Sequence, residues 1–558
     1  MWQTRTMQKT RGVELSVVAA IAAVVLGFGI QGAGIASGYV DPILKAGAQD
    51  EAVYGHAAAA MVHTGQWLTP TFLGRFMLNK PPLLFWAGAA AMRIFGVNAV
   101  ALRMAPIGAA VLCCVVVYAW LRRSSSGLAA ASGVLLLAGN SLFHSMARKF
   151  MTDILLALLI TSAMFVLSLD PSLSRIRSAV FFGLFTGAAI LTKSAAGLVP
   201  LLILVAYCFV VRAGDRPSVQ RVLIAVATAV VVAGPWHAYQ FLVHRDWFVS
   251  EYIRFQLLGS GISAPSRYTG ESNLSFYAWR LIAMAPLLLL LCGGAAAFWK
   301  RHAEETEARL IAVWCAATLL CPLAFGTRVA YYLLPLMPAM AVAAVRLTPF
   351  FRGRWAGAMF CLLAIALGVK AAESGATWGL NYQRESVPSA AALDQYSQLR
   401  RANDLVIVAP DDEFYSAVLD LPKVRYVFLG NVDPTKTTQF FYWLGINLST
   451  QDFCNLDTLT PDYRRHLAAW GLADTKPVGT IIAGASSPEI ATLIRCSADR
   501  DFFIPDNLRE AAVEAGALTH TATPSENGRF FILAKTSERR AGNARQPGAI
   551  IGARIPLR

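Results

Sequence analysis

A short polar stretch between long apolar runs decides how this chain folds. It carries QDEAVYGH at residues 49–56, GQWLTP at 65–70 and NKPPLLFW at 79–86. Residues 50–61 have helical spacing, with Asp50 and Glu51 in the first turn, where acids are also ordinary helix caps. Apolar segments long enough to enter a bilayer precede and follow this stretch, so we expect it to be a loop at the surface of a membrane domain.

The composition supports a membrane domain followed by a soluble one. Of 558 residues, 56% are hydrophobic and 15% are charged, whereas a soluble protein has about 25% charged residues. The long apolar runs end near Val369. We therefore expect a membrane domain at 1–374 with a first outer loop at 36–99, a soluble domain at 375–537, and a basic, disordered tail at 538–558.

The apolar segments predict a polytopic α-helical protein with about 11–13 spans. The predicted spans are Leu15–Ile35, Val100–Trp120, Leu128–Phe143, Ile154–Leu169, Ala179–Leu191, Gly197–Val211, Val222–Phe241, Phe276–Phe298, Ala308–Phe325, Val329–Val345 and Trp355–Val369. Pro81–Phe95 is also apolar but opens with two prolines, so we expect a re-entrant or interfacial helix there.

Basic residues predict the orientation of these spans. Arg5, Lys9 and Arg11 assign the N-terminus to the cytoplasm. Alternation from there gives basic inside loops, which contain Arg122, Arg123, Arg175, Arg177, Arg212, Arg216, Arg221, Lys300, Arg301, Arg309, Arg346, Arg352 and Arg354. The soluble domain is then expected outside. The net charge of +15 reflects loops that face anionic lipid rather than a nucleic-acid partner.

The opposite face also receives charged residues, against the topology rule. They come from five separate loops or turns and are Asp50, Glu51, Arg75, Lys80, Arg148, Lys149, Asp153, Lys193, Arg254, Arg267 and Arg328. Charges near membrane depth are costly and usually functional, although any single Lys or Arg can instead snorkel to the interface. Convergence of acids and bases on one face predicts a shared cavity for an anionic ligand.

The loop motifs resemble those of a known enzyme family. The pattern D-E-x-x-Y, G-x-W-x-x-P, K-P-P-L-x-x-W and F-G-V-N, followed by Arg103, is similar to that of the lipid-linked-sugar glycosyltransferases with the C-type fold. Aminoarabinose transferases that modify lipid A resemble it most, and protein O-mannosyltransferases more distantly. The resemblance implies a C-type fold with an extracytoplasmic α/β domain, in the bacterial inner membrane.

The same resemblance implies the reaction. The protein would move a sugar from a polyprenyl (undecaprenyl) phosphate carrier to an extracytoplasmic acceptor such as lipid A, another glycolipid or a protein. A transporter or flippase of an anionic lipid-linked sugar is the alternative, which predicts repeat symmetry and charges near the midplane. The charges here cluster at one face, and the sequence has no evident internal repeat.

Further motifs extend the resemblance to about residue 340. They are RKFMTD at 148–153, LTK at 191–193 with Ser194 where the family has Gly, the E-x-x-x-R-F pattern at 251–255, and YYLLP at 331–335. By this resemblance the catalytic residues are Asp50, Asp153 and Glu51, and the donor phosphate is bound by Lys80, Lys193, Arg254 and Arg328. Cavity-lining residues are Tyr54, Arg75, Arg148, Tyr331 and Tyr332.

Two departures argue against a metal or cofactor. The family's acid before the phosphate-binding Lys is here Asn79, and residues 256–273 contain no His. Cationic side chains can stabilise charge on a leaving phosphate without a metal, and direct displacement would invert the anomeric carbon. Asp50 could take a proton from an acceptor hydroxyl, or only orient an acceptor that is itself a phosphate. We expect His56 and His63 to be surface residues rather than metal ligands.

The C-terminal part predicts an α/β domain. Buried strands are expected at 404–409, 424–429, 480–483 and 530–534, with helices at Ala390–Ala402 and Asn507–Ala517. It lacks a GxGxxG motif or a P-loop, so nucleotide binding is not supported. Cys454 and Cys496 either pair as a disulfide, as an oxidising compartment allows, or stay free.

Overall fold

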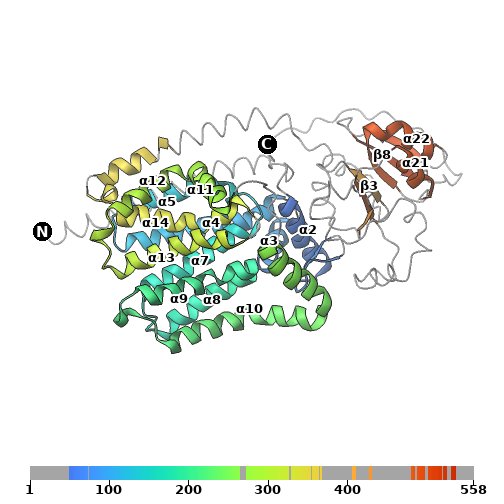
Figure 1. The fold of residues 1–558 in the computed structure, drawn as a ribbon. Coiled ribbons are helices and arrows are strands. Elements are labelled where there is room, and N and C mark those ends of the chain that lie inside the picture. The colour runs from blue at the N-terminus through green and yellow to red at the C-terminus, as the bar shows by residue number, and fades with distance from the viewer. Residues whose placement is uncertain are drawn as a thin grey trace. The chain divides into compact units, whose positions relative to one another are not determined.

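The computed structural model describes residues 49–72, 75–97, 99–263, 272–325, 328–353, 355–363 and 365–366, and in the C-terminal part 405–409, 426–429, 479–483, 487–496, 501–517, 520–524 and 530–535. The chain divides into two compact units. One is a helical bundle and the other contains a mixed sheet (Figure 1). The predicted span Leu15–Ile35, the helix at Ala390–Ala402 and the tail at 538–558 lie outside the described residues.

The bundle consists of α-helices joined by short turns. Its main elements are α2 Gln49–Thr64, α3 Leu83–Phe95, α4 Ala99–Arg122, α5 Gly127–Ala138, α6 Ser141–Ala147, α7 Thr152–Leu169, α8 Ile176–Lys193, η1 Ser194–Leu198, α9 Val199–Val210, α10 Val219–Phe248, η3 Val249–Ser263, α11 Asn273–Met284, α12 Pro286–Ala297, α13 Thr306–Leu320, η6 Ala330–Leu333 and α14 Leu336–Leu347. Within the described residues, six helices are long and apolar enough to cross a membrane, or eight if each bent pair is one span. The protein is therefore a multi-pass membrane protein.

Two predicted spans are broken rather than continuous. Leu128–Phe143 divides into α5 and α6, which bend by 71°, and Phe276–Phe298 divides into α11 and α12, which bend by 104°. Asn140 causes the first break, because its side chain caps α6 by accepting from the N–H groups of Leu142 and Phe143. Pro286 begins α12, where proline is favoured and α11 cannot continue through it. Each bent pair still covers the predicted apolar segment and passes as one broken span, and the bends are features that the hydropathy pattern did not indicate.

Helix α3 agrees with the prediction for Pro81–Phe95. It is a short apolar helix of 13 residues. A helix needs roughly 20 residues to span the bilayer, so α3 is too short to do so. It packs with α2 at one end of the bundle (Figure 1).

Contacts at the helix ends divide the bundle into two opposite faces. Asp153 at the start of α7 meets Lys193 at the end of α8. At the other end of α7, Ser168 accepts from Arg123, which follows α4. The carbonyl of Val210, at the end of α9, accepts from Arg309 near the start of α13. The start of α7 and the end of α8 therefore share one face, called the cluster face below.

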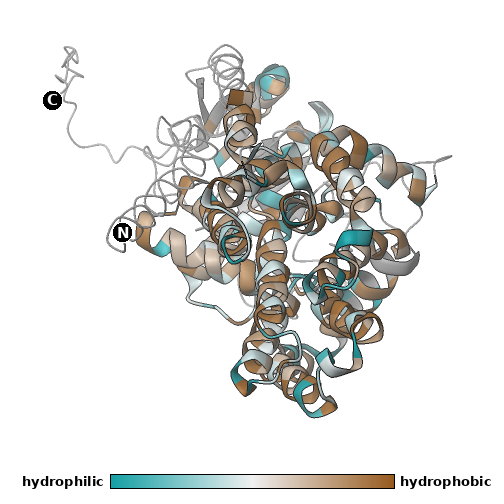
Figure 2. Cartoon of the chain, turned by 90° about the vertical axis from the view of Figure 1, so that its left-hand side faces the viewer, coloured by the Kyte–Doolittle hydropathy of each residue, from teal (hydrophilic) through white to brown (hydrophobic). Residues whose placement is uncertain are grey.

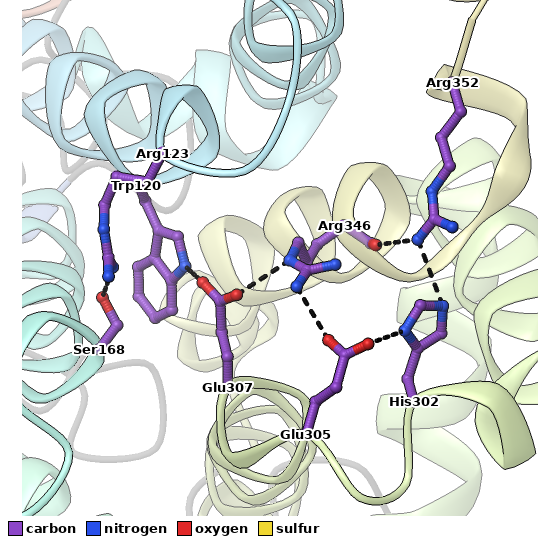
Figure 3. Close-up of polar contacts among 8 residues, drawn as sticks. All are labelled: Trp120, Arg123, Ser168, His302, Glu305, Glu307, Arg346 and Arg352. Atoms are coloured by element: carbon purple, nitrogen blue, oxygen red, sulfur yellow. Dashed lines mark hydrogen bonds and ion pairs between the residues drawn. The ribbon is translucent and has the colours of Figure 1, made fainter.

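The opposite face carries a network of charged side chains (Figure 3). Glu307 accepts from Trp120 Nε1 at 2.7 Å and from Arg346 Nε at 2.9 Å. Arg346 also donates to Glu305, which bonds His302, and Arg352 contacts His302 Nε2. This network links the ends of α4, α13 and α14 at the loops that were predicted to be basic.

Small residues allow α8 and α10 to pack closely. A Cβ added at Gly183 would lie 2.3 Å from the carbonyl oxygen of Ala225, and one at Gly187 would lie 2.8 Å from that of Ala229. Both pairs are four residues apart on their helices. This is the small-residue spacing by which membrane helices approach each other without a hydrophobic driving force. The close packing fixes the position of α8, and therefore of Lys193 at its end, relative to α10.

The bundle has an apolar exterior. Its helices are coloured mainly as hydrophobic over their length (Figure 2). Large apolar side chains such as Phe209, Val231, Leu242 and Leu290 are mostly exposed. In a soluble protein such surface would drive aggregation, whereas a bilayer supplies an apolar solvent for it.

The second unit contains a six-stranded mixed sheet in the order β4-β5-β3-β6-β8-β7. Its elements are β3 Leu405–Ala409, β4 Tyr426–Leu429, β5 Gly479–Ala483, α21 Ser487–Cys496, β6 Asp501–Pro505, α22 Arg509–Gly516, β7 His520–Pro524 and β8 Phe530–Lys535. Strand β3 pairs in parallel with β5 and β6, whereas β8 pairs antiparallel with β6 and β7. The four predicted strands and α22 are confirmed, and β6 and β7 are additional. Cys496 is disulfide-bonded; Cys454 lies outside the described residues.

Candidate active site

The first loop is held against α10 and η3 by its own backbone. Trp86 Nε1 donates to the carbonyl of Trp67 at 2.6 Å, and Trp236 Nε1 donates to that of Leu68 at 2.8 Å. The N–H of Leu78 donates to Glu251 Oε2 at 2.9 Å. These bonds fix both ends of the segment that presents Lys80.

Glu51 is the centre of a buried ion pair. Its two carboxylate oxygens accept from Nε and Nη2 of Arg103 at 2.9 and 3.0 Å, a bidentate arrangement. The N–H of Phe150 donates to the same carboxylate at 2.9 Å. Both charged side chains are almost completely buried. Glu51 thus ties the start of α2 to α4 and to the turn before α7, and it brings Asp50 toward Asp153.

Lys80 lies among the charged groups of the cluster face. Its Nζ donates to Gln256 Oε1 at 2.7 Å. The pKa of Lys80 is lowered to about 8, first by burial and then by the nearby Lys193, while Asp50 and Asp153 partly offset this lowering. Lys80 is therefore a cation at neutral pH whose charge is only partly compensated, which favours an anionic ligand.

Asp153 and Lys193 form the second pair of this site. Lys193 Nζ lies 2.5 Å from Asp153 Oδ1, and the Asp153 side chain is 1% exposed. The same ammonium lies 4.5 Å from the centroid of the Tyr332 ring and 5.4 Å from that of Tyr331, within cation–π range. The two tyrosines of the YYLLP motif thus lie beside Lys193, as the shared site predicted from the sequence requires.

Tyr54 joins α2 to the same group. Its ring packs edge-on against Phe85 at 5.7 Å. Burial raises the pKa of Tyr54 well above its usual value, and Asp50, Tyr331 and Asp153 raise it further. The Tyr54 hydroxyl therefore stays protonated, and acids from α2 and α7 are close enough to act on it.

A cavity of about 370 Å³ opens beside this group. Its polar wall consists of Asp153, Lys193, Ser194, Gln256, Thr318 and Tyr332. The remainder is largely apolar and includes Leu156, Ile160, Ala195, Ala196, Leu198, Val199, Leu202, Leu257, Cys321, Pro322, Phe325 and Pro335. Such a cavity matches an amphiphile with an anionic head and a hydrocarbon tail.

The structure brings most predicted site residues together. Asp50, Tyr54, Lys80, Asp153, Lys193, Tyr331 and Tyr332 form one group, called the catalytic cluster below. Glu51 adjoins it through Arg103. Arg328 contacts the start of α11, where its Nε donates to Asn273 Oδ1 at 2.6 Å.

The remaining predicted arginines are placed differently. Arg254 is exposed on η3, and Arg148 ends α6 beside Phe150. Arg75 lies in β2 Arg75–Phe76, which pairs with β1 Thr71–Phe72. Its side chain is outside the described residues.

Two residues that contact the predicted site were not predicted from the sequence, and the burial of one histidine was predicted wrongly. Gln256 and Arg103 were not predicted as site residues, although Arg103 completes the first-loop motif and Gln256 follows the R-F pair. The expectation that His56 is a surface residue is wrong, because it is 3% exposed within the apolar face of α2. Within the described part of the chain, no group of three His, Cys, Asp or Glu side chains is arranged to hold a metal ion.

The chain is similar in sequence to known proteins. Residues 79–239 match the family model described as dolichyl-phosphate-mannose-protein mannosyltransferase. The chain is 27% identical over 349 residues to the undecaprenyl phosphate-alpha-4-amino-4-deoxy-L-arabinose arabinosyl transferase of Aeromonas hydrophila, covering 57% of this chain and 61% of that one. The chain thus spans less than two thirds of that relative's length.

Solved structures show the same fold. The crystal structure of ArnT from Cupriavidus metallidurans in the apo state superposes with a TM-score of 0.59 at 18% identity, covering 83% of this chain and 95% of that one. ArnT bound to undecaprenyl phosphate gives 0.56 at 17% identity, with coverages of 95% and 99%. This chain therefore has the C-type glycosyltransferase fold, and in sequence it resembles the aminoarabinose transferases.

Proposed function

We propose that this chain is an inner-membrane glycosyltransferase that takes a sugar from a polyprenyl phosphate carrier. The observation that carries the proposal is the cavity, whose wall is charged at Asp153 and Lys193 and largely apolar elsewhere. A lipid phosphate has the same division between head and tail. The names of the similar proteins, an arabinosyl transferase that uses undecaprenyl phosphate and a structure with that lipid bound, support this donor class.

Lys80 and Lys193 are the proposed ligands of the donor phosphate. When the bond between the anomeric carbon and the phosphate oxygen breaks, its electron pair goes to that oxygen. Two ammonium groups in a desolvated site stabilise the developing charge in the transition state. Lys acts here as a point charge and needs no fixed fork geometry. Arg254 and Arg328 are proposed as further phosphate contacts when the donor is bound.

Asp50 is the proposed base. The acceptor oxygen attacks the anomeric carbon from the side opposite the phosphate, and its proton passes to the Asp50 carboxylate. One bond forms as the other breaks, so the configuration at that carbon inverts. Asp153 holds Lys193 in place through the 2.5 Å contact. If the acceptor is a phosphate, Asp50 orients it instead.

Glu51 is a positioning residue in this proposal. Its carboxylate is occupied by Arg103 and Phe150, so it acts through the placement of Asp50. Tyr54, Tyr331 and Tyr332 line the cluster, and Arg75 and Arg148 border the same loops. The reaction is proposed to need no metal or cofactor.

The acceptor is a glycolipid such as lipid A, or a protein, on the extracytoplasmic side. The side of the membrane is supported by the positive-inside rule and by the charged network, with Arg346 at its centre, at the face opposite the catalytic cluster. The N-terminus would face the cytoplasm and the sheet domain the periplasm.

Mass spectrometry of the cell envelope tests this function. Glycolipids and glycoproteins are compared between cells with the protein, without it, and with Lys80→Gln or Glu304→Gln in its place. We expect one sugar-modified species to vanish without the protein and with Lys80→Gln, and to persist with Glu304→Gln, whose side chain lies exposed at the opposite face. If the strains make the acceptor and yet no glycolipid or glycoprotein differs between them, the proposal is contradicted.

A further inference from the structure

Ser194 has a backbone conformation that serine rarely adopts. Its φ is +48° and its ψ is −124°, a region essentially reserved for glycine because a Cβ clashes there. It follows Lys193 directly, where α8 ends and η1 begins. Strain of this kind persists only where the surrounding structure imposes it, and it points to function more often than to chance.

The surroundings of Ser194 impose this conformation from both sides. Its N–H donates to the carbonyl of Ile190, which completes the last turn of α8. Three residues later, a Cβ added at Gly197 would lie 2.2 Å from the Ile190 nitrogen, so η1 folds directly onto the backbone of α8. The chain must turn between these two contacts, and Ser194 is the residue that turns.

The Ser194 side chain is buried at the wall of the cavity. The residue is 6% exposed and lines the cavity beside Lys193 and Gln256. Among the described residues, its Oγ has no partner in hydrogen-bonding geometry. A buried hydroxyl without a partner is costly, and glycine would remove both this cost and the backbone strain.

The neighbouring side chains set the Ser194 hydroxyl as a donor rather than an acceptor. His237 Nδ1 lies 2.8 Å from the carbonyl of Ala233, so this nitrogen carries the proton in the neutral ring. His237 Nε2 then accepts from the Tyr252 hydroxyl at 2.6 Å. Burial raises the pKa of Tyr252 to about 12, with the nearby Ser194 hydroxyl acting in the opposite direction. Tyr252 thus gives its proton to His237 and cannot donate to Ser194.

We infer that Ser194 is a specificity-determining residue whose hydroxyl donates a hydrogen bond to an oxyanion of the lipid phosphate held beside Lys193. The inference rests on the proposed function and goes beyond it, because it adds a neutral donor to the two lysines. A lysine attracts any anion, whereas a fixed hydroxyl selects an acceptor oxygen at one position. Tyr252 and His237 are positioning residues that hold this hydroxyl as a donor.

Binding of two probes to the purified full-length protein tests this inference. The probes are polyprenyl phosphate and the matching polyprenol, which lacks the phosphate, and the variants are Ser194→Ala and Ser194→Gly. We expect both variants to bind polyprenyl phosphate about tenfold more weakly, the size typical of a hydrogen bond to a charged group, and to bind polyprenol as the wild type does. Tyr252→Phe should weaken only phosphate binding, by a smaller factor.

Thermal unfolding separates the hydroxyl from the backbone strain. Ser194→Gly should raise the Tm relative to both the wild type and Ser194→Ala, since glycine alone accepts this φ without strain, yet it should bind the phosphate no better than Ser194→Ala. Wild-type affinity in either variant would overturn the inference. Equal weakening for phosphate and polyprenol would overturn it too, because the residue would then only shape the cavity. If the wild type binds polyprenyl phosphate but transfers no sugar, the proposed function fails instead.

Discussion

Lys193 Nζ lies 2.5 Å from Asp153 Oδ1, which joins the end of α8 to the start of α7. An ammonium and a carboxylate that are both withdrawn from water compensate each other's charge, and removing either partner leaves an uncompensated charge. The pair stands at the wall of a largely apolar cavity. The Asp153–Lys193 pair therefore marks the part of the cavity that is suited to a charged ligand.

The pH dependence of catalysis reports on Lys80. Its pKa is lowered to about 8, mainly by burial, so the side chain is charged below that pH and neutral above it. Phosphate binding needs the charged form, and we expect kcat/KM to be level below pH 8 and to fall about tenfold per pH unit well above it. A bound phosphate favours the ammonium, so kcat should fall at a higher pH.

Lys80→Arg is the matched variant for this pH profile. Arginine does not lose its charge in this range, so any activity that remains should lack the decline near pH 8. The measurement is the initial rate of donor turnover in detergent between pH 6.5 and 9.5. A decline near pH 8 that persists in Lys80→Arg would assign the titration to another group.

The Glu51–Arg103 pair is expected to support stability and, through placement, activity. Glu51→Gln or Arg103→Gln leaves a buried charge without its partner, which costs about 3–5 kcal/mol. Removing both charges together should be less destabilising than the two single changes combined. Thermal unfolding of the detergent-solubilised variants measures this coupling.

Activity of the double variant distinguishes the two roles of Glu51. If Glu51 only positions Asp50, the Glu51→Gln/Arg103→Gln protein should recover part of the turnover lost in each single variant. A double variant that is stable but inactive would mean that the Glu51 carboxylate takes part in the chemistry.

The sequence predicted the helical bundle and most of the catalytic cluster, because the cluster residues lie where apolar segments begin or end. Asp50, Lys80, Asp153 and Lys193 stand at helix ends, so alternation of spans alone assigns them to one face. The breaks at Asn140 and Pro286 were missed because the apolar runs continue through them. A hydropathy pattern carries no information on local capping or bending.

Long-range partners could not be predicted in the same way. Gln256 contacts Lys80 across 176 positions, and its place directly after the R-F pair does not by itself indicate that its side chain reaches the first loop. His56 was expected at the surface because a polar side chain usually is, but α2 packs against α3 and α4 and buries that face. Tertiary packing decides both cases.

Divalent cations are expected not to support turnover. Lys80 and Lys193 already carry positive charge in the catalytic cluster, and each repels a second cation at short range. Asn79, which is 1% exposed, offers an amide where the resembled transferases have an acid. Activity should be the same in excess chelator and in added Mg²⁺ or Mn²⁺. A loss of more than half the rate on chelation, restored by one of these ions, would contradict this expectation.

The orientation predicts different access to two exposed loop positions. Gln66 lies in the turn after α2 and Ser124 in the turn after α4. A membrane-impermeant maleimide added to intact spheroplasts should label Gln66→Cys at once and Ser124→Cys only after the membrane is permeabilised. Cys361, which is exposed, is replaced by Ser in both proteins. The reverse labelling would turn the catalytic cluster toward the cytosol and exclude an extracytoplasmic acceptor.

Transfer by the purified protein is the most direct measurement of the central claim, that the charged groups of the catalytic cluster promote cleavage of the bond between sugar and lipid phosphate. With a polyprenyl phosphate donor labelled in the sugar, the wild type should release polyprenyl phosphate and label the acceptor in equal amounts, and only when both are present. Asp50→Asn and Lys80→Gln should each lower the rate by at least about a hundredfold, the scale of a lost acid–base or electrostatic contribution, with Glu304→Gln as the unaffected control. Full turnover in both cluster variants, with the fold intact, would contradict the account.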